Sequence, residues 1–413
     1  MQLKSKNKDY VNIGNDKFKT YERVSKRILF ISNGHGEDNH SSYIIRTLQE
    51  QRPDLEIAAM PLVGEGRAYR SLDIPIIGPT QVMPSGGFFY MNPLHLFKDL
   101  QAGLVWLTWR QLRAVLDYAP SCDLIMATGD VVSQSFAYLT GLPFISFISC
   151  LSSLYEGKLN LGLILWQVLQ SSRCQAVFTR DLYTAKDLQQ QGLTKTQFGG
   201  IPSLDRLIPT GKDLQLVTGQ PLVALLPGSR PAEAIRNFRL QLDLVLETVK
   251  LPGGEKINFR AALVPGVMNE LEAIASTQGW QHENGKLTNG QAQVICYADA
   301  FNDIICNCDL VIGMAGLAVD QAVAIGKAVI QIPGPGPQFT YQFAEAQTRL
   351  LGVSVQTIGT EPATGETLKQ AAVRVLETLA DTEYLGKCRD NGLERFGRQG
   401  ASLRITQAIN AII

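Results

Sequence analysis

The stretch Leu225-Leu226-Pro227-Gly228-Ser229-Arg230 decides the fold of this 413-residue chain. It ends an apolar run, residues 221–226, that predicts a buried parallel strand, and a helical pattern begins near Ala232. A strand that ends in a turn of small residues and opens a helix leaves backbone N–H groups and the positive helix end facing a crevice. Arg230 adds a cation suited to binding two phosphate oxygens at once. The stretch therefore predicts an anion-binding turn in an α/β domain.

A second element of the same kind lies further along the chain. An apolar strand pattern at 309–312 is followed by the turn Gly313-Met314-Ala315-Gly316 and by a helix from Leu317. Single glycine-rich turns also occur in α/β proteins that bind no ligand, so it is the pair that carries weight. Two such turns in one half of the chain predict a site for a nucleotide diphosphate.

Strand and helix patterns alternate along most of the sequence. In the first half, strands are expected at 27–32, 57–63, 74–77, 123–128, 143–149, 176–179 and 196–199. Helices are expected between many of them, notably at 98–118 and 181–191. This alternation is typical of βαβ units and mostly parallel sheets. We therefore predict an α/β fold with two doubly wound, Rossmann-like domains that face each other across a cleft.

The length of the chain also favours two domains, because it exceeds what one core usually supports. A polar stretch with glycine and proline at 202–220 is the expected linker, and a second alternation follows from 221 to about 380. We expect a flexible basic tail at 1–26, an N-terminal acceptor-binding domain at 27–205 and a nucleotide-sugar-binding domain at 221–385. A C-terminal helix near 391–413, within the segment 386–413, could pack back on the first domain.

The bulk composition excludes some classes of function. Lysine plus arginine (38) equals aspartate plus glutamate (38), which argues against a broad nucleic-acid-binding surface. Seven cysteines, an odd number, are typical of free thiols in a reducing compartment such as the cytoplasm. Cys306-x-Cys308 has no second cysteine pair or histidine cluster nearby, so neighbouring strand positions explain it better than a metal site.

The sequence shows neither a signal peptide nor an apolar stretch long enough to span a membrane. The first 27 residues lack the apolar core of a signal peptide and lean basic, as in a disordered tail or a segment weakly attracted to an anionic membrane. Apolar stretches at 86–109, with Phe88, Phe89, Trp106 and Trp109, and at 159–169 fall short of the roughly 20 uninterrupted apolar residues of a spanning helix. They are either core helices with a loop or an aromatic surface that dips into a bilayer to meet a lipid.

Polar residues of the first domain cluster at predicted strand ends, where open α/β sheets bind ligands. His35, Glu37 and Asp38 follow the strand 27–32, and Asp130 follows the strand 123–128. Each could move a proton in catalysis, or could simply serve in a turn or as a helix cap, as Asp38 could for the next helix. The other histidines, which have no such companions, are expected at the surface or in packing: His40, His95 and His282.

Several short stretches of the sequence resemble those of a known family. The chain resembles lipid-A-disaccharide synthase, a glycosyltransferase of the two-Rossmann-domain (GT-B) type, and more closely the lipid-A-disaccharide-synthase-related group. The resemblance covers most of the chain after the tail. It is carried by the stretch quoted first with Glu233, by Gly199-Gly200-Ile201-Pro202 with Asp205, by Cys308-Asp309-Leu310-Val311-Ile312, by Arg395-Phe396-Gly397 and by Gly400-Ala401-Ser402.

The resemblance implies metal-free, inverting transfer of an acylated glucosamine from a UDP donor to an acylated glucosamine 1-phosphate, without a cofactor. By position, it implies that Gly228, Ser229 and Arg230 hold the donor pyrophosphate, with Gly313 and Gly316 beside it. An arginine and helix N-termini would then neutralise the leaving diphosphate in place of Mg²⁺. It also implies a cytoplasmic protein bound peripherally at the inner face of a membrane, and a homodimer is an open expectation.

Inverting transfer needs a base that takes the proton of the attacking acceptor hydroxyl. The resemblance favours a carboxylate near Asp130 for this role. His35 has the better unperturbed pKa for a base but could instead hydrogen-bond the acceptor or a phosphate. Glu37 is the third candidate, and Asp38 lies beside it.

Two segments depart from the family pattern. The family has Gly-Thr-Ala-Thr-Leu-Glu-Ala where this chain has Gly316-Leu317-Ala318-Val319-Asp320-Gln321-Ala322. The ribose-binding glutamate is therefore replaced by Gln321, or by Asp320 with a shift. The first loop, Gly-Glu-x-Ser-Gly-Asp in the family, is Gly34-His35-Gly36-Glu37-Asp38 here. Gln338 follows a proline- and glycine-rich segment, and either touches donor sugar hydroxyls or belongs to a rigid turn.

Three functions remain open, of which the one named first here is the function that we expect. It is a UDP-sugar-dependent glycosyltransferase acting on a lipid or glycolipid acceptor at a membrane surface. A UDP-sugar 2-epimerase would use the same fold without an acceptor, but would have no reason for the apolar region 88–109. A non-catalytic relative that binds a nucleotide sugar or a partner protein is favoured by Gln321, and disfavoured by the presence of Arg230, Asp130 and the Gly34–Asp38 loop.

Overall fold

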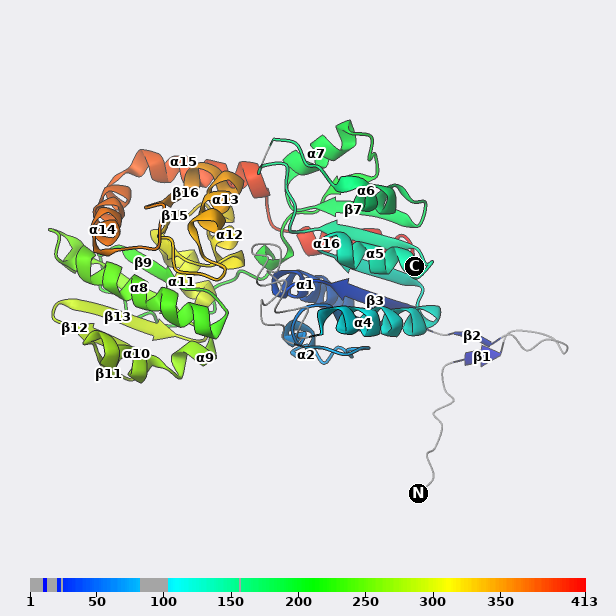
Figure 1. Cartoon of the computed structure of the whole chain (residues 1–413), viewed down its shortest axis with the longest axis horizontal. Helices are drawn as coiled ribbons and strands as arrows, with labels where there is room; N and C mark the ends of the chain where they lie inside the picture. The colour runs from blue at the N-terminus through cyan, green and yellow to red at the C-terminus, as the bar shows by residue number, and fades with distance from the viewer. Residues whose placement is uncertain (1–9, 13–20, 24, 82–102, 156) are drawn as a thin grey trace, which may run out of the picture.

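The computed structural model of the chain describes residues 10–12, 21–23, 25–81, 103–155 and 157–413. Two α/β domains lie side by side, the N-terminal one drawn in blue to green and the C-terminal one in green to orange (Figure 1). A separate antiparallel hairpin of β1 (Tyr10–Asn12) and β2 (Tyr21–Arg23) lies outside both. The predicted pair of Rossmann-like α/β domains is confirmed.

The N-terminal domain is built on six parallel strands in the order β4-β3-β5-β6-β7-β8. They are β3 (Arg27–Ser32), β4 (Glu56–Pro61), β5 (Leu124–Thr128), β6 (Phe144–Ile148), β7 (Cys174–Thr179) and β8 (Thr196–Phe198). Helices cover both faces of this sheet, so its strands have continuous apolar sequences rather than alternating ones. The strand predicted at 74–77 is wrong: only a single bridge joins Ile76 to Ala59, and Pro75 in its middle has no N–H to donate to a ladder.

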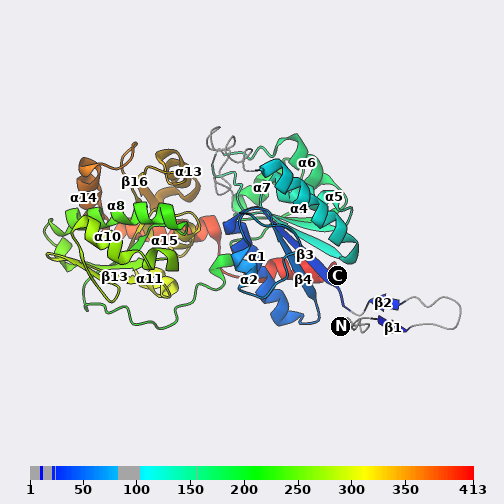
Figure 2. The same cartoon turned by 60° about the horizontal axis from the view of Figure 1, so that its bottom comes forward.

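The helices of this domain are α1 (His35–Gln51), α2 (Arg67–Arg70), α4 (Leu104–Tyr118), α5 (Val131–Leu139), α6 (Gly162–Gln170) and α7 (Leu182–Gln190), with short 3₁₀ turns η2 (Ala119–Ser121) and η3 (Pro202–Leu204). Side chains of α4, α5, α6 and α7 pack on one face of the sheet. Those of α1, α2 and the C-terminal helix α16 (Ala401–Asn410) pack on the other. Figures 1 and 2 show this layering.

The C-terminal domain has an eight-stranded sheet in the order β11-β12-β13-β10-β9-β14-β15-β16, antiparallel only from β11 to β13. Its strands are β9 (Leu222–Leu226), β10 (Asn258–Ala262), β11 (Gln281–Glu283), β12 (Lys286–Asn289), β13 (Ala292–Tyr297), β14 (Leu310–Gly313), β15 (Ala328–Gln331) and β16 (Val355–Thr357). Its helices are α8 (Pro231–Val249), α9 (Pro265–Met268), α10 (Leu271–Gln278), α11 (Phe301–Asn307), α12 (Leu317–Ala324), α13 (Tyr341–Leu351), α14 (Gly365–Ala380) and α15 (Thr382–Phe396), with η4 (Gly254–Lys256) and η5 (Gly352–Ser354). The strand and helix predicted around Arg230 are β9 and α8, and those predicted around Gly316 are β14 and α12.

The C-terminal segment crosses back to the first domain. The sequence predicts one helix near 391–413, and this prediction is wrong, because α15 ends at Phe396 and α16 begins at Ala401. Gly397 and Gly400, with φ of +66° and +106°, adopt left-handed backbone conformations that break the helix. The Asp205 carboxylate then accepts hydrogen bonds from the N–H groups of Gly400 (2.5 Å) and Ser402 (2.6 Å) at the start of α16.

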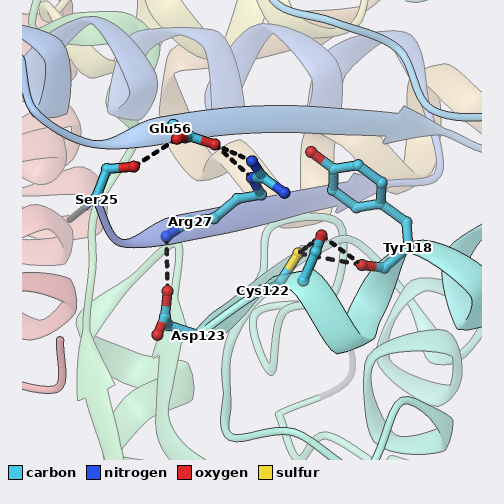
Figure 3. Close-up of polar contacts among 7 residues, drawn as sticks. Ser25, Arg27, Glu56, Tyr118, Cys122 and Asp123 are labelled. Atoms are coloured by element: carbon cyan, nitrogen blue, oxygen red, sulfur yellow. Dashed lines mark hydrogen bonds and ion pairs between the residues drawn. The ribbon is translucent and has the colours of Figure 1, made fainter. Parts of the chain in front are cut away.

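A polar cluster joins the amino ends of three strands (Figure 3). Arg27 at the start of β3 donates from Nε to Glu56 of β4 (2.7 Å), and its backbone N–H donates to Asp123 just before β5 (2.7 Å). The guanidinium also lies over the Tyr118 ring, 5.6 Å from its centroid. Because the strands are parallel, all their amino ends, where this cluster lies, are at one end of the sheet. All their carboxyl ends are at the other end, which faces the cleft between the domains.

Candidate functional site

A cleft of about 1020 Å³ lies between the two domains. Its walls are the segments that follow β3, β4, β5 and β6 in the first domain and β9, β10, β13 and β14 in the second. These are the carboxyl ends of parallel strands, where open α/β sheets bind ligands. The volume lies at the upper end of typical ligand sites, roughly 300–1,000 Å³. Predicted site residues that line it are His35, Glu37, Asp130, Gly228, Ser229, Arg230, Gly316, Asp320, Gln321 and Gln338.

The first of the two predicted anion-binding turns connects β9 to α8. Gly228 has a φ of +113°, and a Cβ there would lie only 3.3 Å from the carbonyl oxygen of Met314, so a side chain would be strained and crowded. Arg230 is the N-cap residue of α8, and its Nη1 donates a hydrogen bond to the Gln338 side-chain oxygen. Glu233 accepts from the backbone N–H groups of Gln338 (2.8 Å) and Phe339 (2.7 Å). Gln338 thus lies against the arginine, on a loop fixed by Glu233.

Two buried amides hold the turns in place. Asn237, on α8, donates from Nδ2 to the carbonyl oxygens of Pro227 (2.9 Å) and Met314 (3.2 Å), one in each turn. Gln347, on α13, donates to the carbonyls of Ala315 (3.1 Å) and Gly316 (3.2 Å). With their carbonyls bonded to these amides, the two turns lie next to each other and the N-termini of α8 and α12 meet in the cleft. Neither amide is predictable from the sequence, because both lie well inside helices and belong to no motif.

The opposite wall of the cleft is shaped around Asp130. Its Oδ1 accepts from the Val132 N–H (2.9 Å) and caps α5, while its own N–H donates to the Asn33 side chain (3.1 Å). Gly129, with a φ of +127°, is needed here because a Cβ would collide with that Asn33 side chain. The helix-cap reading of Asp130 is therefore correct in part, since the same carboxyl group also lines the cleft.

The ionisable groups of this wall have pKa values that burial shifts away from their ordinary values. Burial raises the pKa of Glu37, and the nearby Asp130 raises it further. Burial also raises the pKa of Asp130. The pKa of His35 is lowered by burial and then by the charges of Arg230 and Arg67, which favours a neutral imidazole. A neutral imidazole and two carboxyls with raised pKa values are groups that can accept or return a proton.

Asp38 and Gly313 do not line the cleft. Asp38 is buried under α1, where it accepts from the Ser32 hydroxyl (2.6 Å), and that hydroxyl also bonds Tyr69 (2.5 Å). Burial raises the pKa of Asp38 to about 8. It does not cap the helix, because the N-cap of α1 is Gly34.

Asp320 and Gln321 are bonded to the other domain. Arg180, directly after β7, forms an ion pair with Asp320 (Nη2 to Oδ2, 2.9 Å), and Gln321 donates to the Ser203 carbonyl (3.1 Å). The two residues predicted to bind the ribose therefore connect the domains in this structure. Arg180 was missed by sequence analysis, although an arginine at the carboxyl end of a buried strand was a visible signal.

The remaining histidine and cysteine predictions have mixed outcomes. His40 is a packing residue, as predicted: it is buried in the cleft wall in a T-shaped contact with the Phe147 ring, and burial and Arg180 lower its pKa to about 3. His282 pairs with Glu272 (2.9 Å), and His95 lies outside the described residues. The prediction that Cys306 and Cys308 occupy neighbouring positions of a strand is wrong, because Cys306 lies in α11 and Cys308 directly follows that helix. Within the described ranges, no group of three or more histidine, cysteine or acidic side chains could hold a metal.

The outer face of α4 carries exposed aromatic side chains. Trp106 and Trp109 are 61% and 48% exposed and stack with ring centroids 4.8 Å apart. On α6, which packs on the same face of the sheet, Leu163 is 72% exposed. Phe88 and Phe89 lie outside the described residues. No helix in the part of the chain that the structure describes has both the length and the hydrophobicity to cross a membrane.

Two facing Rossmann-like domains with a cleft at their strand ends define the GT-B fold. Solved structures with this arrangement resemble the chain over nearly its whole length. The UDP-GlcNAc 2-epimerase from Neisseria meningitidis bound to UDP-GlcNAc has a TM-score of 0.54 at 14% identity, covering 93% of this chain and 100% of that one. MurG of Acinetobacter baumannii has a TM-score of 0.55 at 16% identity, covering 94% and 99%.

A third similar structure is the spinosyn rhamnosyltransferase SpnG complexed with thymidine diphosphate, with a TM-score of 0.58 at 12% identity, covering 93% of this chain and 100% of that one. Identities this low establish the fold of the chain and not its activity. The sequence itself matches no protein-family model and no curated protein.

Proposed function

We propose that the chain is a metal-independent, inverting glycosyltransferase that moves a sugar from a UDP donor to a lipid or glycolipid acceptor. In its finer form the proposal is an activity like that of lipid-A-disaccharide synthase, with an N-acylated or acylated glucosamine as the transferred sugar. One observation carries the proposal. Arg230 and the N-termini of α8 and α12 lie on one wall of the cleft, and the candidate proton-transfer groups lie on the opposite wall.

The donor half of the proposal rests on the second domain. Gly228, Ser229 and Arg230 would bind the pyrophosphate, helped by the positive end of α12 beside Gly316. Gln338, which lies against Arg230, would reach the donor sugar. The arginine and the helix ends would stabilise the negative charge of the departing UDP without a metal. Asp320 or Gln321 would contact the ribose after giving up its bond to the first domain.

The acceptor half rests on the first domain. Asp130, His35 and Glu37 are the candidates for the base that deprotonates the acceptor hydroxyl, and all three line the cleft. An amphipathic acceptor is supported by the exposed tryptophans on α4, which suit a protein bound at the inner face of a membrane. Assembly as a homodimer stays an expectation.

Calorimetric titration with UDP, UDP-N-acetylglucosamine, UDP-glucose and GDP, with and without Mg²⁺, tests the donor site. We expect metal-independent binding that is selective for UDP. Arg230→Ala should raise the Kd for UDP by roughly 10- to 100-fold, because a charge-assisted hydrogen bond contributes about 1.5–3 kcal/mol. Arg374→Ala removes an exposed arginine on α14 and should leave the Kd unchanged. Equal affinities in wild type and Arg230→Ala would refute the phosphate assignment.

A UDP-sugar 2-epimerase is the second candidate, and two observations favour it. Glu37 and Asp130 are acidic groups with raised pKa values in one wall of the cleft, which suits removal and return of a carbon-bound proton. The epimerase of N. meningitidis also shares the fold.

Incubation with UDP-N-acetylglucosamine in D₂O, without an acceptor, separates the two candidates. Deuterium at C2 of the sugar supports the epimerase, and turnover only with an added lipid acceptor supports the transferase. UDP binding without either reaction would support a non-catalytic relative.

A further inference from the structure

The first-domain end of the cleft has an apolar wall. Leu104 of α4, Val132 and Phe136 of α5, Leu62 after β4 and Leu151 after β6 all line the cleft. Four of them, all except Leu104, belong to one hydrophobic cluster of this domain or pack against it. The helices α4 and α5 that carry three of these side chains contact each other. The five side chains therefore form one continuous surface, which we call the apolar wall.

Two polar side chains of α4 line the same end of the cleft, but their donors are already bonded to the backbone. The Thr108 hydroxyl donates to the Leu104 carbonyl (2.8 Å). Gln111 donates from Nε2 to the carbonyls of Leu62 (3.2 Å) and Pro79 (3.2 Å), which joins α4 to the segment after β4. A sugar or a phosphate would find no free donor on these two side chains, whereas a hydrocarbon chain needs none.

The other side of the same helix start faces solvent. Val105, Trp106 and Trp109 are exposed there, together with Arg110 and Arg113. Aromatic and apolar side chains beside arginines suit the headgroup region of an anionic bilayer. A helix with its side chains is roughly 10–12 Å across. A bilayer bound at this side of α4 would therefore lie about one helix diameter from the apolar wall.

We propose that the apolar wall binds the hydrocarbon chain of a lipid acceptor, which enters the cleft from a membrane beside α4. The inference rests on the proposed function, and it names the part of the acceptor that the first domain recognises. Asp130 caps α5 two residues before Val132, and its side chain lines the cleft too. A chain bound along the wall would thus leave the polar head of the lipid near Asp130. Because apolar burial is not directional, the wall would select the length of the chain and not the headgroup.

Calorimetric titration with hexyl, heptyl and octyl glucoside, each below the concentration at which it forms micelles, tests the wall in the wild-type protein. The Kd should fall about fourfold for each added CH₂, because each one brings a further equal area of apolar surface out of water. The series needs no variant, so its result does not depend on the folding of a mutant.

Two variants locate the bound chain. Leu104→Gln and Leu151→Gln each place an amide in the apolar wall and should raise the Kd for octyl glucoside by roughly fivefold or more, because the amide loses water without gaining a partner. Leu163→Gln is the matched control, since it makes the same change at an exposed leucine on the outer face of α6. It should leave the Kd unchanged. Thermal unfolding of all three variants checks that they are folded.

A Kd that does not change with chain length would overturn the inference. So would equal losses of affinity in Leu163→Gln and the two cleft variants, because the glucoside would then be adsorbed on the outer face. Titration with UDP separates this failure from failure of the proposed function. UDP binding without chain-length dependence refutes the apolar wall as a lipid site and leaves the donor site standing. Chain-length dependence without UDP binding refutes the proposed transferase and leaves a lipid-binding cleft.

Discussion

At the scale of single residues, burial decides what an ionisable group can do. Glu37 and Asp38 are neighbours on α1, yet one lines the cleft and the other lies beneath the helix against Ser32 and Tyr69. Both pKa values are raised by burial, but only Glu37 can reach a ligand. The segment that the sequence predicts as the Gly34–Asp38 loop is the N-cap and first turn of α1, and its chemistry depends on which side of the helix each carboxyl occupies.

Asp38→Asn should change the pH dependence of stability. The folded-state pKa of Asp38 is about 8, against an ordinary value of 3.8, so its stabilising protonated form is fully present below about pH 4 and lost as pH rises through 8. Wild-type unfolding free energy should fall with a slope of up to about 1.4 kcal/mol per pH unit in this window. The Asn variant, which cannot ionise, should have a flatter curve and be the more stable protein at pH 8.

Urea unfolding of both proteins from pH 4 to pH 9 measures this difference. Asp54→Asn is the control, because Asp54 is exposed and pairs with Arg52 at the surface. It should leave the slope unchanged. Parallel curves for wild type and Asp38→Asn would show that Asp38 is ionised in the folded protein.

At the scale of elements, α16 shows how a helix is assigned to a distant sheet. Ile405 and Ile409 are fully buried in the same core as Ile28 and Phe30 of β3. The Asp205 carboxylate, at the end of η3, accepts three backbone N–H groups at the start of α16: those of Gly400, Ala401 and Ser402. The two segments are 195 residues apart in the sequence and are joined by these hydrogen bonds.

Asp205→Ala should therefore destabilise the first domain, although α16 is the last helix of the chain. Loss of a helix cap costs about 0.5–2 kcal/mol. Tryptophan fluorescence follows the effect, because Trp106, Trp109 and Trp166 lie in the first domain and Trp280 in the second. Faster hydrogen exchange of the α16 amides should accompany the change, and exchange in α10 should not alter. Asp213→Ala, in the interdomain segment, is the control.

At the scale of the whole molecule, the cleft and the exposed aromatic surface belong to the same domain. The helices α4 and α6 cover the face of the first sheet that is opposite α16 (Figure 2). The amino end of α4, at Leu104, lines the cleft, while Trp106 and Trp109 point to solvent beside Arg110 and Arg113. A bilayer bound at this helix would lie next to the first-domain wall of the cleft.

Replacing Trp106 and Trp109 together by serine should reduce the fraction of protein that sediments with anionic liposomes several-fold, because the indole rings would lose their place at the interface. UDP binding should not change. Leu403→Ser removes an exposed apolar side chain of α16, on the opposite face of the sheet, and is the matched control. If the double variant sediments like wild type, the aromatic face is not the membrane contact.

The sequence by itself determined the local architecture. Apolar runs followed by small-residue turns and helical periodicity predict β9 with α8 and β14 with α12, because a strand, its turn and the next helix are contiguous in the chain. The same reasoning identified Arg230, Asp130 and Glu37 as strand-end residues that line the cleft. It failed where a local pattern was ambiguous, as at Pro75 and at Cys306.

Only the tertiary structure decided which distant residues meet. Arg180 and Asp320 are 140 residues apart, and Asp205 contacts a helix that starts near the end of the chain. Such pairings depend on how two domains are placed, and no periodicity in the sequence reports that placement. The same holds for Asn237 and Gln347, whose amides bind the carbonyls of the two glycine-containing turns from inside helices. Local hydrophobic patterns set the elements, whereas long-range packing set the charges and contacts around the cleft.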